Sequence, residues 1–171
     1  MRTMRFPLVL IIAVICLSGL PFSASGADNE VTRQSLRRVP GIYVSVERLD
    51  PEIRKHVLTE ALLKKKVETR LRRAGIKVIS KEEWYGLEGN PYLYINVHVL
   101  RTPAAQEYIY SVYIAFRQDV YPVREPIEIP GGTTWTTGGI VGLTYKPESI
   151  FASVKQQVDT FIAAYLSVNP K

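Results

Sequence analysis

The stretch from Tyr92 to Tyr121 limits the fold of this chain more strongly than any other part of the sequence. It contains two runs in which apolar and polar residues alternate, joined by a link, Thr102–Glu107, that includes Pro103. Alternation with a period of two is typical of a strand with one buried side, and a proline in the link prevents further pairing there. These residues therefore predict a long β-hairpin on which the rest of the chain packs.

Each strand of this hairpin has one side that is more apolar than the other. We expect the two apolar sides to lie under helices, because an antiparallel sheet covered on one face divides its side chains in this way. The predicted core side chains are Leu93, Ile95, Val97 and Val99 in the first strand, and Tyr108, Tyr110, Val112, Ile114 and Phe116 in the second.

Besides the hairpin, four further segments and an edge strand around Trp135 complete the predicted fold. Residues 41–49 alternate as a half-buried strand, and residues 76–79 form a short apolar strand. Residues 59–74 and 147–168 carry apolar side chains at helical spacing, which predicts two amphipathic helices. The order of these elements is β-α-β-β-β-β-α. It indicates a single α+β domain over residues 41–171, with a mostly antiparallel sheet of about four to five strands and the two main helices packed on one face.

Prolines and glycines interrupt the pattern between Val123 and Tyr145. We predict a loop or an edge segment up to Pro130, an edge strand around Trp135 and a mobile glycine-rich loop after it. The glycine-rich residues 131–142 lack the lysine of a phosphate-binding loop. The sequence leaves open whether they form a binding site or only a turn.

Residues 1–27 have the three parts of a secretory signal peptide. Two arginines precede an apolar run from Pro7 to Leu20, and small residues follow as far as Ala27. We expect cleavage near Ala27 and a periplasmic or secreted protein. The alternative, a retained membrane anchor, is less consistent with an apolar run shorter than the about 20 residues that span a bilayer. Residues 28–40 are polar and basic, and we interpret them as a flexible N-terminal arm.

The single cysteine, Cys16, lies inside the apolar run and follows Ile15, whereas a lipoprotein anchor needs a small residue before its cysteine. Cleavage would remove this cysteine, so we expect no disulfide in the exported chain. The formal net charge of +6 comes from mixed rather than blocked charges. Together with export, this argues against a nucleic-acid partner.

The sequence shows no motif for catalysis or metal binding. Its two histidines, His56 and His98, lie in different elements and have no metal-ligand neighbour at a recognisable spacing. There is no G-x-S-x-G motif for a serine nucleophile. We therefore expect no metal and no cofactor, and we favour a non-enzymatic binding or envelope-assembly domain. A small hydrolase-type enzyme with a cleft near Trp135 and His98 is the alternative.

The most unusual compositional feature is the number of tyrosines in the hairpin. The side opposite the predicted core carries aromatic residues that could contact a partner, or that could pair across strands to stabilise an open sheet. The candidate interaction surface consists of Tyr92, Tyr94, His98, Tyr113 and Trp135.

The exposed side of the helix 59–74 is strongly basic. It could bind an anionic membrane surface, or it could be an ordinary solvated face with acidic partners four residues away. The candidate residues are Lys64, Lys65, Arg70, Arg72 and Arg73.

Residues 41–49, the helix 59–74 with its R-x-A-G-I-K-V-I turn at Arg72–Ile79, and the strand from Tyr92 resemble a class of small exported bacterial α+β domains. Members are the N-terminal domain of TolB and domains of curli-secretion and penicillin-binding-protein-activator lipoproteins. The resemblance covers residues 41–120 and lacks the lipobox of the lipoprotein members. It implies a non-enzymatic periplasmic adaptor that binds another envelope protein by an exposed sheet edge or face.

Overall fold

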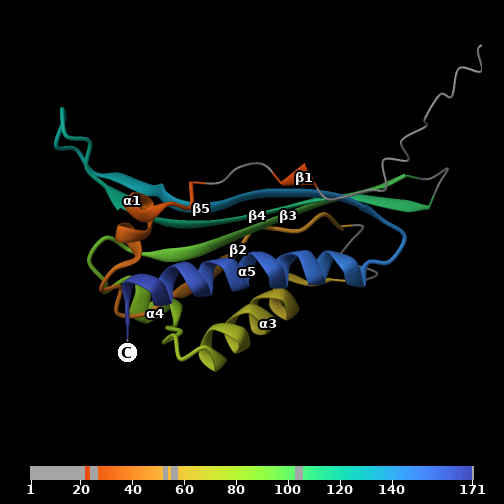
Figure 1. Cartoon of the computed structure of the whole chain (residues 1–171), viewed down its shortest axis with the longest axis horizontal. Coiled ribbons are helices and arrows are strands. Elements are labelled where there is room, and N and C mark those ends of the chain that lie inside the picture. The colour runs from red at the N-terminus through yellow and green to blue at the C-terminus, as the bar shows by residue number, and fades with distance from the viewer. Residues whose placement is uncertain (1–21, 24–26, 52–53, 55–57, 103–105, 171) are drawn as a thin grey trace, which may run out of the picture.

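The computed structural model describes residues 22–23, 27–51, 54, 58–102 and 106–170 (Figure 1). It shows a five-stranded mixed sheet with the strand order β1-β5-β4-β3-β2, and Figure 1 places the two long helices on the same side of it. The α+β class predicted from the sequence is confirmed. The elements are β1 (Phe22–Ser23), α1 (Glu30–Arg33), η1 (Gln34–Leu36), β2 (Tyr43–Val46), α3 (Glu60–Arg73), α4 (Lys81–Trp84), β3 (Tyr92–Thr102), β4 (Glu107–Val120), β5 (Ile129–Thr144) and α5 (Glu148–Val168).

The predicted hairpin is formed by β3 and β4, which pair without interruption from Tyr92 opposite Arg117 to Thr102 opposite Glu107. The aliphatic side of β3 is buried, and so are the core positions of β4 from Tyr110 to Phe116. This division of the two strands is the one that their alternation predicts. Pro103 lies outside the described residues.

β2 runs parallel to β3, whereas the other strand pairs are antiparallel. The short strand predicted at residues 76–79 is reduced to one parallel bridge between Ile42 and Val78. The Ile42 N–H donates to the Lys77 carbonyl at 2.8 Å, and the Ile79 N–H donates to the Ile42 carbonyl at 3.1 Å. Strand, helix and parallel bridge thus form the predicted strand–helix–strand order.

β5 corrects the prediction of a mobile glycine-rich loop. The whole segment from Ile129 to Thr144 is a strand that pairs with β4, with register shifts where extra residues are accommodated. At one of these shifts Gly138 has a φ of 84°, a backbone conformation that favours glycine. At Gly142 a Cβ atom would lie 2.5 Å from the ring of Tyr110, the residue directly opposite. Glycine occurs here because an aromatic ring crosses the backbone.

The core lies between the sheet and the two long helices. Leu63, Val67 and Leu71 of α3 are buried at helical spacing. α5 buries a longer stripe, in which the Phe161 ring lies 5.4 Å from Trp135 and 6.2 Å from Phe116. The two predicted amphipathic helices are therefore present on the predicted face. Within the described part of the chain, no helix is long and apolar enough to cross a membrane.

The segment 28–40, predicted as a flexible arm, is folded onto the domain. Leu36 is completely buried. Asn169, next to the end of α5, accepts a hydrogen bond from the Arg38 N–H and donates one to the Leu36 carbonyl, each at 2.8 Å. Tyr165 donates to the Val39 carbonyl at 2.9 Å. These contacts join residues more than a hundred positions apart, so the local polar composition of the segment could not reveal them.

Candidate binding surface on the open face and outer edge of the sheet

The face of the sheet away from the helices carries four of the five residues predicted as an interaction surface. Tyr92, Tyr94 and His98 alternate along β3, and Tyr113 of β4 lies opposite Asn96 between them. The fifth residue, Trp135, is on the other side and is treated below. The alternation of β3 was therefore sufficient to bring these side chains onto one face.

Tyr94 is held by contacts within the domain. Its hydroxyl donates to the Glu47 carboxylate at 2.6 Å and accepts from the Asn96 side chain at 3.1 Å. The Arg117 guanidinium lies 3.7 Å from the centre of its ring. Burial, together with the bond to Glu47, raises the pKa of the Tyr94 phenol. These contacts correspond to the cross-strand interpretation of the tyrosines, in which they stabilise the sheet.

Tyr92 is also engaged by its neighbours. Its ring meets the Trp84 indole edge to face at 5.6 Å, and the same indole stacks on Tyr43 at 5.1 Å. Trp84, from the short helix α4, thus joins the starts of β2 and β3. The aromatic rings at this end of the open face are therefore engaged by contacts within the domain.

The opposite end of the open face is apolar and exposed, which the sequence analysis missed. Leu100 on β3 lies opposite Ile109 on β4, which lies opposite Leu143 on β5. Their exposed fractions are 64%, 39% and 59%, and that of Val141, two residues before Leu143, is 50%. We call these four residues the aliphatic row. For Leu100 and Ile109 the signal was present, because both occupy solvent-side positions of alternating strands, whereas Val141 and Leu143 lie in the segment predicted as a loop.

His98 lies beside the aliphatic row. A shallow depression of about 230 Å³ is bordered by His98, Leu100, Ile109 and Val141. Leu100, Ile109 and Val141 contribute apolar side chains to this border, so the depression extends the apolar surface of the aliphatic row. Among the described residues, no group of three histidine, cysteine, aspartate or glutamate side chains is placed to hold a metal ion. His56 lies outside the described residues.

The outer edge of β5 borders the same apolar surface. Among the described strands, β5 pairs on this side with β1 alone, where Phe22 lies opposite Val141 and Ser23 lies opposite Ile140. β1 is antiparallel to β5, and Figure 1 shows it above the long β5 strand. Both residues of β1 belong to the segment that the sequence predicts to be removed as a signal peptide.

Trp135 is buried, so its prediction as a surface residue is wrong. Its ring packs on Phe161 in the core, and its indole Nε1–H donates to the Asp28 carboxylate at 2.9 Å. His98 is exposed on the opposite face of the sheet. Trp135 and His98 therefore do not share the cleft that the hydrolase alternative required.

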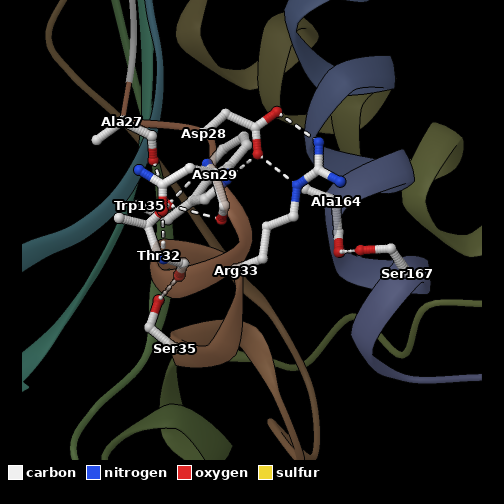
Figure 2. A network of polar contacts seen from close by, with 9 residues as sticks. All are labelled: Ala27, Asp28, Asn29, Thr32, Arg33, Ser35, Trp135, Ala164 and Ser167. Carbon is white, nitrogen blue, oxygen red and sulfur yellow. Dashed lines mark hydrogen bonds and ion pairs between the residues drawn. The ribbon is translucent and has the colours of Figure 1, made fainter.

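Asp28 connects the N-terminal segment to this tryptophan (Figure 2). Its carboxylate accepts from Arg33 Nε at 2.6 Å and from Arg33 Nη2 at 2.9 Å, in addition to the Trp135 bond. The hydrogen bond from Arg33 lowers the pKa of the Asp28 carboxyl against the opposing effect of burial, and the Trp135 N–H lowers it further. The residue after the predicted cleavage site is thus firmly placed against the end of the core.

The five basic residues predicted as one patch on α3 separate into two groups. Lys64 and Arg72 both pair with Glu68, at 3.9 and 3.1 Å. Lys65, Arg70 and Arg73 instead line a groove between α3 and α5. The first group corresponds to the solvated-face interpretation, and the second is a separate feature of the surface.

Neither a family model nor a curated protein sequence matches this chain. Among solved structures, the chain is similar to a PelC variant from Paraburkholderia phytofirmans that was solved as a dodecamer, with 17% sequence identity and a TM-score of 0.39. The match covers 88% of this chain and 96% of that one.

Proposed function

We propose that this chain is an exported, non-enzymatic binding domain of the bacterial cell envelope, which binds an extended segment of another envelope protein along the outer edge of β5. The observation that carries the proposal is the combination of a 16-residue strand, whose outer edge pairs with two of the described residues, and an adjoining exposed aliphatic row. Export is supported by the three-part organisation of residues 1–27.

Cleavage near Ala27 would remove β1 and leave the outer edge of β5 without its antiparallel neighbour. An edge strand with unpaired N–H and C=O groups is a template for pairing with another chain. Strand addition of this kind takes its affinity from main-chain hydrogen bonds and its specificity from alternate side chains. β1 itself indicates what the edge accepts, namely an antiparallel strand.

The aliphatic row supplies side-chain contacts for the incoming segment. Large apolar residues gathered on one exposed surface are typical of interaction sites. Val141 and Leu143 lie on β5 itself, and Ile109 continues the surface onto β4. A segment added at the edge would bring alternate side chains to this side of the sheet, where they would remove the row from water.

A photo-crosslinking experiment tests the proposal. A benzophenone amino acid is placed at Val141 of the full-length chain, which is then produced in cells that can export it. The matched control carries the same amino acid at Val123, a fully exposed valine between β4 and β5. We expect Val141 to crosslink to one envelope protein, and we expect a Leu143→Lys substitution to abolish that crosslink.

The mass of the protein recovered from the envelope fraction provides the second readout. A chain that starts near residue 28 is expected. Recovery of a chain that retains Phe22, or equal crosslinking from Val123 and Val141, would overturn the proposal.

A further inference from the structure

A groove of about 560 Å³ lies between the two long helices, on the other side of the molecule's core from the aliphatic row. Its floor consists of side chains from both helices, including the buried Val67 and Val158. One end is open hydrocarbon, where Leu62 is 41% exposed and the Phe151 ring is half-buried. The groove therefore offers an apolar surface that the domain leaves partly in water.

Five cationic side chains border this apolar surface, and no acidic residue is among the described residues that line it. They are Lys65, Lys66, Arg70 and Arg73 from α3 and Lys155 from α5. A solvated helix face usually intersperses both signs of charge, whereas here the cations gather around one concave apolar surface. Such a combination is complementary to a ligand with a hydrocarbon part and a negative part.

Three of these cations are available to a ligand. Arg70 and Lys155 both pair with Asp159, which lies just outside the groove. Lys65, Lys66 and Arg73 have no ion-pair partner among the described residues. The Lys66 ammonium lies 3.8 Å from the centre of the Phe151 ring, so it covers the apolar end and can move aside.

The two ends of the groove differ in character. The contact between Lys66 and Phe151 places the aromatic ring beside the middle of α3, and Arg70 and Arg73 lie in the last turn of that helix. Leu62 and Arg73 are separated by about 16 Å along the helix, at 1.5 Å per residue. This length suits an extended hydrocarbon chain, and the arginine end suits a phosphate, which guanidinium groups bind in a bidentate manner.

We infer that the α3–α5 groove binds a single-chain phospholipid with an anionic headgroup, its acyl chain over Phe151 and Leu62 and its phosphate at Arg73. The volume lies within the range of about 300–1,000 Å³ that is typical of small-molecule sites, which is consistent with one acyl chain. This inference is independent of the β5 edge, because none of the groove residues belongs to the sheet.

Calorimetric titration of the isolated protein tests the inference with three probes below their micellar concentrations. Lysophosphatidylglycerol carries both parts of the proposed ligand, lysophosphatidylcholine of the same chain length lacks the net charge, and glycerol phosphate lacks the chain. We expect lysophosphatidylglycerol to bind at least about tenfold more tightly than either of the other two.

Two double variants with the same change of charge on the same helix provide matched controls. Lys65→Glu with Arg73→Glu alters the groove, and Lys64→Glu with Arg72→Glu alters the exposed face beside it. The groove variant is expected to lose at least about tenfold in affinity, and the face variant to stay within about threefold. Thermal unfolding of both variants verifies that they are folded.

Three results would overturn the inference. Equal losses in the two double variants would mean diffuse attraction to the basic helix. Equal binding of lysophosphatidylcholine would mean that the anionic headgroup is not recognised. Binding that occurs only to micelles or to anionic vesicles would mean a membrane-surface interaction in place of a single-lipid site.

Discussion

The Asp28 carboxylate accepts hydrogen bonds from two donors. The Arg33 guanidinium is five residues away in the sequence, and the Trp135 indole is 107 residues away. The indole ring is buried in the core, so its N–H depends on this acceptor. A buried donor without a partner costs about 1–3 kcal/mol, more than the about 0.5–1.5 kcal/mol that an ordinary hydrogen bond contributes. Asp28 thus has a structural role larger than its position at the end of the described domain suggests.

Replacing Asp28 with alanine is expected to lower the free energy of unfolding by about 1–3 kcal/mol, because the buried Trp135 N–H loses its acceptor. Urea denaturation measures this change. Glu30→Ala, which removes an exposed carboxylate two residues away, is the control, with an expected effect below about 0.5 kcal/mol. Equal effects of the two substitutions would show that the Trp135 bond contributes nothing.

The same carboxylate makes stability depend on pH. Because the Arg33 hydrogen bond lowers the pKa of Asp28 in the folded state, its contribution is complete above the ordinary aspartate value of about 3.9. It is lost as the pH falls through the lower folded-state pKa. We expect the stability difference between the wild-type protein and Asp28→Asn to shrink between pH 5 and strongly acidic solution, in urea titrations at each pH. A difference that stays constant would contradict this account.

At the scale of secondary-structure elements, β5 shows why glycine misleads sequence interpretation. Gly142 makes room for the Tyr110 ring, and Gly138 supplies the positive φ of a bulge. Both functions require a paired strand opposite, yet in the sequence the same residues indicate a loop. Whether these glycines belong to a paired strand or to a loop is decided by the residues of β4 that lie opposite them, not by the sequence of β5 itself.

Gly142→Ala is expected to lower the free energy of unfolding by about 1–3 kcal/mol, because the new methyl group would overlap the Tyr110 ring. Gly86→Ala is the matched control, since its Cβ would meet nothing closer than the Glu83 carbonyl oxygen at 3.6 Å. Thermal unfolding compares the two variants. A Gly142 variant as stable as the control would mean that the ring moves aside without cost.

The elements that could be predicted from the sequence are those whose buried side chains recur at a short, regular spacing. β3 and β4 repeat every two residues, and α3 and α5 repeat their apolar positions every turn, so local pattern was sufficient. The docking of Leu36 and the burial of Trp135 depend on partners far along the chain and could not be predicted. For the candidate interaction surface, alternation placed Tyr92, Tyr94, His98 and Tyr113 on one face of the sheet. It could not show that the Tyr92 ring packs on Trp84, or that the Arg117 guanidinium lies over the Tyr94 ring.

At the scale of the whole molecule, Asn169 ties the two ends of the described domain together. Its side chain makes hydrogen bonds to Arg38 and Leu36 in addition to one with its own helix. The segment 36–38 near the start of the described domain is therefore held by Asn169 near its end, and the stability of one end depends on the other.

Asn169→Ala is expected to speed hydrogen exchange at the Arg38 amide by about tenfold or more, because this N–H loses its acceptor and the segment opens more readily. The control is Ser167→Ala, which removes a hydrogen bond made only within α5, to the Ala164 carbonyl. Hydrogen exchange followed by NMR distinguishes them. Similar exchange at Arg38 in both variants would show that Asn169 is not the tie.

This tie has a consequence for the timing of folding. A chain delivered N-terminus first, as the proposed export requires, presents residues 28–40 more than a hundred residues before Asn169. The hairpin of β3 and β4 can form as soon as it emerges, because its contacts are local. Leu36 and Arg38, in contrast, must wait for α5 to arrive. Under the proposed export, residues 36–38 therefore dock after the hairpin has formed, and until α5 arrives Trp135 lacks the Phe161 ring that packs on it.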